Sequence, residues 1–463
     1  MRELVELQDI RKEAVRPIAV GEAITPAPAW LHRSLDSLWE EMIRKASDIP
    51  QTGFASLEKE FREKLLKLGA NLLGEALPYV LGTGREGQRI ACPACGAQAR
   101  FIENRPRTIT TLVQEIRLQR AYYHCPKCGK GEVPLDRLLS LHGTSFSPGV
   151  REAICLLDAE IPFDRGSELL RRLSAIRLDK QEGRRLAEGL GKELEKQTVE
   201  ELDNVWRPKK PIPRELSQAP ARLYFSPDGT MVNIQGDWKE AKVGTVFTTQ
   251  IPKRREEPQR EETRYVATMR DADDLGKRMY VEALKLGLSD KTRVVIVADG
   301  AHWIWTWAEN SLPKERVEIV DFYHASEKLW ELSRSVFGEE NPKGQGWARR
   351  WSRKLYDADA RAAISAMRRL RPRSKEGREC LRKTLGYFHY HRRRMCYRDW
   401  RRQGYFIGSG ITESSCKRLV GARFKQAGMR WTREGVQSIL QLRLAVLNNR
   451  WDYLWGTGCR ETA

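Results

Sequence analysis

Three acidic residues have the type and setting needed for metal-assisted chemistry: Asp228 in SPDGT (226–230), Asp299 in VVIVADG (294–300) and Glu413 in GSGITES (408–414). Each Asp ends an apolar, β-branched run and precedes a Gly, which predicts two carboxylates at the C-terminal ends of neighbouring buried strands. Because an Asp-Gly pair alone is a common turn, this prediction depends on the two strand contexts. With Glu413 the pair would form an oxygen-rich pocket for Mg²⁺, the usual machinery for phosphoryl transfer on nucleic acid.

Four of the nine cysteines form a second candidate site. Cys92 and Cys95 make one C-x-x-C knuckle, Cys125 and Cys128 make another, and each knuckle is followed by a Gly. Four thiolates in this arrangement can close a tetrahedral site on structural Zn²⁺. The segment between them, rich in Thr, Ile, Val and Tyr, predicts a β-hairpin and hence a zinc ribbon over 89–133. A redox pair needs only one C-x-x-C, so zinc is the preferred interpretation.

The charge of the chain favours a polyanionic partner. Lys and Arg outnumber Asp and Glu by 82 to 62 in 463 residues, a net charge of +20. Residues 342–402 alone carry twenty Lys and Arg against five Asp and Glu, with Trp and Tyr interleaved. Basic groups neutralise phosphates and aromatics stack on unpaired bases, which suits DNA in a distorted state. The alternative is a solvated helical insertion whose aromatics form its own small core.

The elements expected after residue 220 follow the order of an RNase H-like fold, in which the first acid lies on the first strand and the second follows the fourth strand. We expect strands at 221–226, 231–234, 242–250, 264–268, 293–298 and 317–320, and helices at 271–286 and 325–336. Glu327 and Glu331, on the last helix, are rivals for the third carboxylate. Glu413 is preferred because its Gly-Ser-Gly approach lets the backbone come close to DNA.

The predicted fold class is therefore multidomain α+β: an RNase H-like α/β catalytic domain with a basic helical insertion, preceded by helical segments and the zinc ribbon. Residues 134–205 are expected to be helical, and 164–190 resemble a helix-turn-helix, although Arg-bearing helix pairs are also common in ordinary bundles. The predicted parts are a helical region 1–88, the ribbon 89–133, helices 134–205, a Pro-rich linker 206–219, the catalytic domain 220–341, the insertion 342–402 and final helices 403–463. Since no run of about eighteen apolar residues occurs, we expect a cytoplasmic protein and no membrane partner.

Several blocks of this sequence resemble one family over residues 90–457. They are Asp228-Gly229-Thr230, the DGAxWIW run at 299–305, DFYHA at 321–325, GSGxxESxxK at 408–417, RFKxxGMxW at 423–431 and NRWDxxW at 449–455. Together they look like the DDE transposases of bacterial insertion sequences, closest to the ISKra group, which is allied to the Mutator-like clade. The paired cysteine knuckles and PLD at 134–136 also look like that group.

The resemblance implies a DNA transposase with Asp228, Asp299 and Glu413 as its catalytic triad. Asp321 and His324 match a D-x-x-H element. Two Mg²⁺ (or Mn²⁺) ions per site would support hydrolysis that frees a 3′-OH and its transfer into target DNA. Double-stranded transposon ends and target DNA, a homo-oligomer on DNA and a place at the bacterial nucleoid are the implied partners and location.

Eight residues are predicted to contact DNA: Arg392, Arg393, Arg394, Lys417, Arg418, Arg423, Lys425 and Trp431. Trp431 could instead be a core residue. Two functions from other classes stay open: an RNase H-like nuclease without strand transfer, and a domesticated DNA-binding protein without activity.

Overall fold

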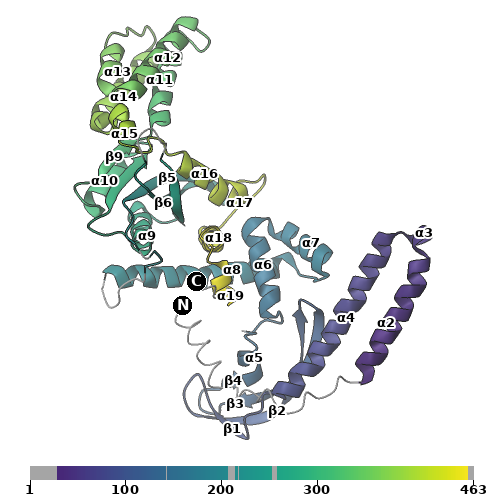
Figure 1. Cartoon of the computed structure of the whole chain (residues 1–463). Coiled ribbons are helices and arrows are strands. Elements are labelled where there is room, and N and C mark those ends of the chain that lie inside the picture. Colours follow the sequence, from purple (N-terminus) through teal and green to yellow (C-terminus); the bar gives the residue numbers. More distant parts are fainter. Residues whose placement is uncertain (1–28, 142, 207–213, 217, 253–257, 457–463) are drawn as a thin grey trace. The chain divides into compact units, whose positions relative to one another are not determined.

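The computed structural model describes residues 29–141, 143–206, 214–216, 218–252 and 258–456. The chain divides into two compact units, residues 1–186 with 452–463, and residues 187–451. The protein has mixed α and β structure with one sheet in each unit (Figure 1). Of the helices described, none is both long enough and apolar enough to cross a membrane.

The first unit begins with a helical hairpin and continues into a four-stranded antiparallel sheet. Helices α2 (Ala29–Ser47), α3 (Ile49–Thr52) and α4 (Phe54–Leu81) confirm that this part of the predicted region 1–88 is helical. Residues 1–28 of that region lie outside the described residues. The sheet has the order β1-β2-β3-β4 and consists of β1 (Arg89–Ala91), β2 (Gln98–Thr111), β3 (Gln114–His124) and β4 (Gly131–Glu132).

The rest of this unit is helical, as predicted. Helices α5 (Pro134–Leu138), α6 (Pro148–Glu160) and α7 (Phe163–Ser174) follow the sheet, and α8 (Lys180–Trp206) leads into the second unit. Helix α7 ends at Ala175, which adopts a left-handed conformation with φ of 57°. The break between α7 and α8, at residues 175–179, lies inside the segment 164–190 that resembles a helix-turn-helix. Helix α8 continues well past residue 190. Of the predicted linker, residues 207–213 and 217 lie outside the described part of the chain.

The second unit is built on a five-stranded sheet in the order β7-β6-β5-β8-β9. Strands β5 (Arg222–Ile234), β6 (Asp237–Thr249) and β7 (Arg260–Thr268) form an antiparallel meander. Strands β8 (Arg293–Ala298) and β9 (Val317–Val320) then add in parallel to β5, and their predicted bounds are confirmed. Every residue of β8 after Arg293 is buried, as expected for a parallel strand covered on both faces.

One strand prediction is wrong. The segments 221–226 and 231–234 are a single strand, β5, which pairs with β6 without interruption and sets Asp228 opposite Val243. The true turn lies further on, at Gln235 and Gly236, whose φ angles are 54° and 106°. Two consecutive positive φ angles give the turn that joins twisted hairpin strands. The Asp-Gly pair at 228 is therefore extended backbone within a strand.

Helices cover the sheet and continue its core. They are α9 (Ala272–Lys285), α10 (His302–Ser311) and α11 (Phe322–Phe337). The basic insertion forms α12 (Pro342–Asp357), α13 (Ala360–Met367), α14 (Lys375–His391) and α15 (Tyr397–Arg402) (Figure 1). Helices α12 and α13 are separate, because Asp359 caps the start of α13 by accepting from the N–H of Arg361.

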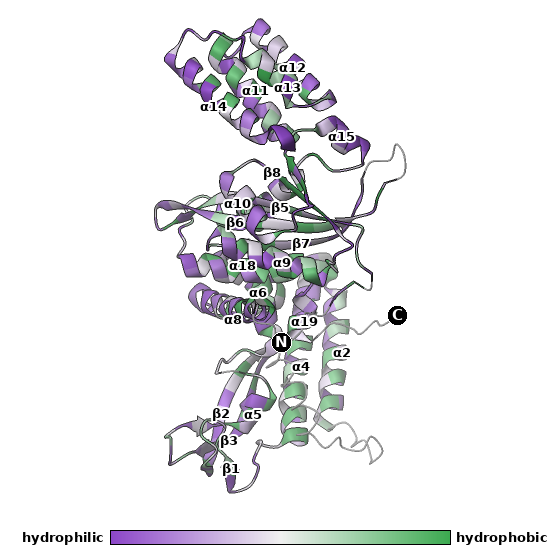
Figure 2. Ribbon diagram, turned by 90° about the vertical axis from the view of Figure 1, so that its left-hand side faces the viewer, coloured by the Kyte–Doolittle hydropathy of each residue, from purple (hydrophilic) through white to green (hydrophobic). Residues whose placement is uncertain are grey.

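The insertion shares one apolar core with the sheet. Phe388 and Tyr397 are fully buried there, and Trp347 and Trp351 pack against the same core. Hydrophilic and hydrophobic residues alternate around these helices (Figure 2), as expected of helices that cover a core with one face. The aromatic residues of the insertion therefore serve packing at least in part, as the alternative interpretation of this segment predicted.

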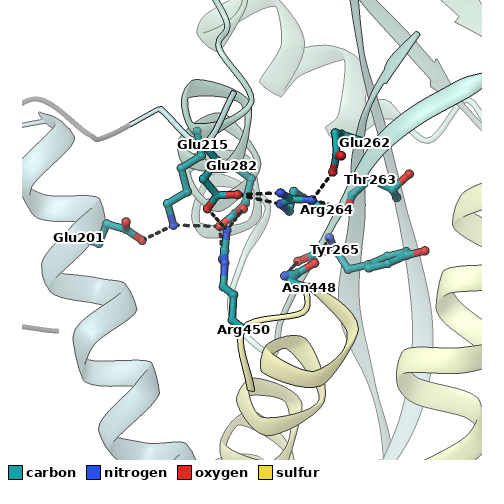
Figure 3. A network of polar contacts seen from close by, with 10 residues as sticks. Glu201, Glu215, Glu262, Thr263, Arg264, Tyr265, Glu282, Asn448 and Arg450 are labelled. Atoms are coloured by element: carbon teal, nitrogen blue, oxygen red, sulfur yellow. Dashed lines mark hydrogen bonds and ion pairs between the residues drawn. The ribbon is translucent and has the colours of Figure 1, made fainter. Parts of the chain in front are cut away.

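The last helices of the second unit are held by ion pairs that include the buried Glu282. These helices are α16 (Gly410–Ser415), the π-helix η2 (Cys416–Gly421), α17 (Ala422–Phe424) and α18 (Arg433–Leu447). Helix α19 (Trp451–Trp455) follows them, where the chain passes from the second unit to the first. Arg450 donates to Glu282 at 2.6 Å and to Glu215 at 3.0 Å, and Glu215 also pairs with Arg264 (Figure 3). Burial alone would raise the pKa of Glu282, but Lys285 and Arg450 hold that pKa below its usual value.

Candidate active site and cysteine centre

Asp228 and Asp299 lie at the same level of neighbouring strands. Strands β5 and β8 run parallel, and Phe225 opposite Ile296 is their last paired position. Each Asp lies three residues beyond that pair, on the side where β8 has ended. Beyond the pairing, the hydroxyl of Ser226 donates to the carbonyl of Val297 at 2.8 Å and keeps the two strands together. The two carboxylates therefore face the same edge of the sheet.

The pKa of Asp228 is raised above its ordinary value. Burial is the largest cause, and the negative charge of Asp299 raises it further. The N–H of Gly229 donates to Asp228 Oδ1 at 2.7 Å and opposes this rise. On the other oxygen, Cys416 Sγ lies 3.4 Å from Asp228 Oδ2. Burial and the Asp228 charge raise the pKa of this thiol, so it stays protonated and donates to the carboxylate.

The turn that carries Asp299 is held from the helical insertion. Asp299 Oδ1 accepts from the N–H of Ala301 at 2.9 Å, which closes the turn. The Tyr387 hydroxyl on α14 donates to the backbone carbonyl of Asp299 at 2.7 Å. Gly300 is needed here because its φ is +105° and a Cβ would meet the Tyr387 ring at 2.7 Å. The backbone of the turn and the tyrosine are thus fitted to each other.

His391, one turn after Tyr387 on α14, contacts the same turn. Its Nε2 lies 3.1 Å from the carbonyl of Gly300, and Arg394 lies 3.3 Å from its Nδ1. Because a guanidinium only donates, Nδ1 must accept and Nε2 must carry the proton given to Gly300. Burial and Arg394 lower the pKa of His391 to about 4, which keeps the ring neutral. Arg394 in turn donates to Glu318 at 2.5 Å.

Asp321 and His324 have different surroundings. Asp321 is buried, and its Oδ1 accepts from the N–H of His324 at 2.8 Å and caps α11. Its Oδ2 accepts from the N–H of Ser409 and, at 2.5 Å, from the hydroxyl of Ser409. Asp321 therefore holds the segment that leads to Glu413. His324 lies near Asp228, whose pKa it lowers slightly.

Glu413 does not join the two aspartates in this structure. Helix α16 is docked on the sheet, because Thr412 donates to the carbonyl of Ser226 at 3.0 Å. The Glu413 side chain is nevertheless 66% exposed and pairs with Lys417 at 2.7 Å. Among the described residues, the four knuckle cysteines are the only group of three or more Cys, His, Asp or Glu with ligand atoms close enough to share a metal. Asp228 and Asp299 thus supply two adjacent carboxylates, without a third.

Two of the residues predicted to contact DNA are buried, so that prediction is wrong for them. Arg423 has no exposed surface and its guanidinium lies 4.8 Å from the Trp431 ring centre. Trp431 is also buried and packs edge-on against Phe424. Their shared core position agrees with the alternative weighed for Trp431. Other predicted contacts remain at the surface: Arg392, Arg393, Lys417, Arg418 and Lys425 are exposed, and Arg394 is partly buried in its ion pair.

The four knuckle cysteines are gathered for a metal. Cys92 and Cys128 lie 3.7 Å apart between sulfurs, and Cys95 and Cys125 lie 3.6 Å apart. Tetrahedral zinc with bonds of about 2.3 Å needs sulfurs about 3.8 Å apart. Both knuckles also close in the same way, with left-handed glycines, Gly96 and Gly129, at φ of 71° and 70°. The four residues could therefore hold a structural metal such as zinc.

Sequence reasoning missed Tyr387, His391 and Cys416 as parts of the site. The i, i+4 spacing of Tyr387 and His391 on one helix was visible, but nothing local showed which surface they face. Cys416 follows Glu413 by three residues, but it lies at no ligand spacing from another cysteine, so no local pattern marks it.

The fold and these two sites define a mixed α and β protein with a carboxylate pair at a sheet edge and a four-cysteine centre. The chain belongs to the uncharacterised protein family UPF0236, whose family model matches residues 53–453. Comparison with curated proteins finds no match.

Proposed function

We propose that this protein is a DDE-type DNA transposase with an RNase H-like catalytic domain. The observation that carries the proposal is that Asp228 and Asp299 each lie three residues beyond the last pair of two neighbouring parallel strands. The sheet order β7-β6-β5-β8-β9, with three antiparallel strands followed by two parallel ones, supports the same assignment. It agrees with the order of elements that the sequence predicts and with the motif resemblance.

Asp228 and Asp299 would hold Mg²⁺ or Mn²⁺. Two adjacent carboxylates, one with a raised pKa, fit a divalent cation, because its charge relieves their repulsion. When bound, such ions activate the attacking oxygen and stabilise the leaving one. The proposal needs Glu413 as the third carboxylate, so Glu413 must exchange its pairing with Lys417 for the metal site. His324 is within reach to orient a phosphate beside Asp228.

The partner in this proposal is double-stranded DNA, both as transposon ends and as target. The exposed Arg392 and Arg393 lie directly after His391, which contacts the Asp299 turn. Phosphates bound there would lie next to the proposed catalytic edge. Lys417 and Arg418 offer further positive charge beside Glu413. A homo-oligomer on DNA and a place at the bacterial nucleoid belong to the same proposal.

A strand-transfer assay with a pre-nicked DNA end tests the proposal. The DNA should come from the sequence that flanks the reading frame, where terminal inverted repeats are expected. With Mg²⁺ the protein should join the 3′-OH end to a target plasmid. Asp299→Ala should lower the joined product by roughly a thousandfold while retaining DNA binding. The matched control is Asp290→Ala, at an exposed Asp eight residues before the end of β8, which should remain active.

The pairing of Glu413 with Lys417 favours one second candidate, a DNA-binding protein without activity. Such a protein would bind the ends but neither cleave nor join them under any divalent cation. A third outcome, cleavage without joined product, would identify an RNase H-like nuclease. If Asp299→Ala is as active as the unmodified protein, the carboxylate pair is not the catalytic site.

A further inference from the structure

The helical hairpin formed by α2 and α4 leaves an apolar face uncovered. Six large apolar residues are exposed on it: Leu35, Trp39, Ile43, Phe54, Phe61 and Leu65. Trp39 alone is 68% exposed. No residue of α2 is buried, and Ala70 is the only buried residue of α4. Within the part of the chain that the structure describes, nothing covers this face of the hairpin, and an exposed apolar face of this kind marks a site of protein–protein contact.

Polar contacts between the helices fix the register of the hairpin. Trp30 donates to Glu75 at 2.7 Å, while Lys64 pairs with Glu41 and Lys45 pairs with Glu60. As the position on α2 advances from 30 to 41 to 45, the partner position on α4 falls by the same number of residues, from 75 to 64 to 60. This is the register of an antiparallel pair. The helices therefore meet along one seam, where these polar contacts lie among half-buried apolar residues such as Leu38 and Leu68.

The same register brings the exposed apolar residues of both helices together. It sets Trp39 at about the level of Leu65 along the hairpin, and Ile43 at about the level of Phe61. On each helix the exposed apolar residues lie about a quarter to a half turn around the helix axis from the seam, and the direction of this rotation is the same on both helices. In an antiparallel pair this puts both sets of apolar residues on one face of the hairpin. Figure 2 shows hydrophobic residues recurring along both helices.

The charge of the hairpin identifies the kind of partner. Residues 29–81 carry seven Lys or Arg and eight Asp or Glu, whereas the whole chain has an excess of twenty positive charges. A surface with nearly equal numbers of positive and negative charges does not attract DNA. It also does not repel a second, identical surface.

The size of the face agrees with a dimer. Helix α2, of 19 residues, lies along α4 for about 28 Å, and each helix is about 10 Å wide, which gives a shared face on the order of 600 Å². Stable interfaces bury about 800 Å² on each partner. We propose that the apolar face of the α2–α4 hairpin binds the same face of a second copy of this chain. The product is a four-helix bundle that forms without DNA.

Sedimentation equilibrium of the full chain tests this proposal. The protein is treated with nuclease and measured in 1 M NaCl, so that nucleic acid cannot bridge two copies. We expect twice the 53.4 kDa mass of one chain. The double variant Trp39→Glu with Ile43→Glu should dissociate at least roughly a hundredfold more readily, because it places charges in the bundle core. Leu65→Glu, on the other helix, should also weaken the dimer.

The chain offers a matched control at two exposed apolar residues of the second unit. Trp238→Glu with Ile251→Glu makes the same two changes and should leave the dimer intact. Unchanged far-ultraviolet circular dichroism identifies variants that keep their fold. A monomeric unmodified protein overturns the proposal and indicates that residues 1–28 or a different protein covers the face. A dimer that survives all three hairpin substitutions, or one that the control also dissociates, overturns it too. None of these outcomes depends on strand-transfer activity.

Discussion

The hydroxyl of Tyr387 donates a 2.7 Å hydrogen bond to the backbone carbonyl of Asp299, joining the helical insertion to the proposed catalytic turn. Burial, followed by the charges of Asp299 and Asp321, raises the pKa of this phenol, so it remains a donor. The insertion thus contacts the backbone of the turn as well as extending the core. Any DNA bound by the insertion would therefore contact a segment that is hydrogen-bonded to the backbone of Asp299.

Tyr387→Phe should lower strand-transfer activity about tenfold without changing the affinity for DNA. The substitution keeps the ring against Gly300 and removes only the hydroxyl, which leaves the Asp299 carbonyl without its donor. We expect a loss of about 1 kcal/mol in unfolding free energy. The control is Tyr390→Phe, because Tyr390 is half exposed and stacks on His302. Equal activity of the two variants would contradict a positioning role for Tyr387.

His391 predicts a pH dependence of stability. Its pKa is lowered to about 4 in the folded protein, against about 6.5 in the unfolded chain. Between these values the unfolded chain binds more protons, so stability is complete above about pH 7 and falls as the pH drops toward 4. The loss from this residue is roughly 3 kcal/mol at most.

Urea unfolding of the protein and of His391→Gln between pH 4 and 8 checks this prediction. Gln keeps a donor for Gly300 but does not titrate in this range. The difference in unfolding free energy between the two proteins should shrink as the pH falls. A difference that is constant with pH would show that His391 titrates normally.

The sequence was most informative where a local pattern alone determined the structure. Strand β8 was predicted with its correct bounds because residues 293–298 form one β-branched run between turn signals. The two knuckles were found for a similar reason, since the ligand spacing of a zinc site is local. Strand β5 was divided in error, because Asp228-Gly229 has the composition of a turn and only its pairing with β6 keeps it extended.

The contacts around the carboxylates could not be predicted in this way. Tyr387 lies 88 residues from Asp299 in sequence, and its role arises only when α14 packs on the sheet. The sequence predicts a DNA contact at Arg423 because this residue follows Glu413 at a helical spacing, but Arg423 is buried beside Trp431. Glu413 was expected to join the two aspartates, and the nearby Lys417 pairs with it instead. Each of these outcomes depends on which side chains come together in the folded protein, and no local sequence pattern gives that information.

Removing one knuckle cysteine should abolish metal binding at the cysteine centre. Cys125→Ser lacks one of four ligands, and we expect bound zinc, measured by atomic absorption, to fall from one equivalent to nearly none. The melting temperature of the first unit should fall with it, because metal binding stabilises the fold. Cys380→Ser is the control, since Cys380 lies on α14 away from ligand spacing. A Cys125→Ser protein that retains one equivalent of zinc would refute the four-cysteine site.

The ion pairs around Arg450 should contribute more to stability than pairs at the surface. Arg450→Leu leaves Glu282, which is buried, with Lys285 as its remaining cation. We expect a loss of about 3 kcal/mol in unfolding free energy by urea titration, because truncating one partner leaves a buried charge poorly compensated. Arg353→Leu removes an exposed pair with Asp357 and should cost less than about 0.5 kcal/mol. Equal losses in the two variants would mean that the network in Figure 3 does not anchor the last helices.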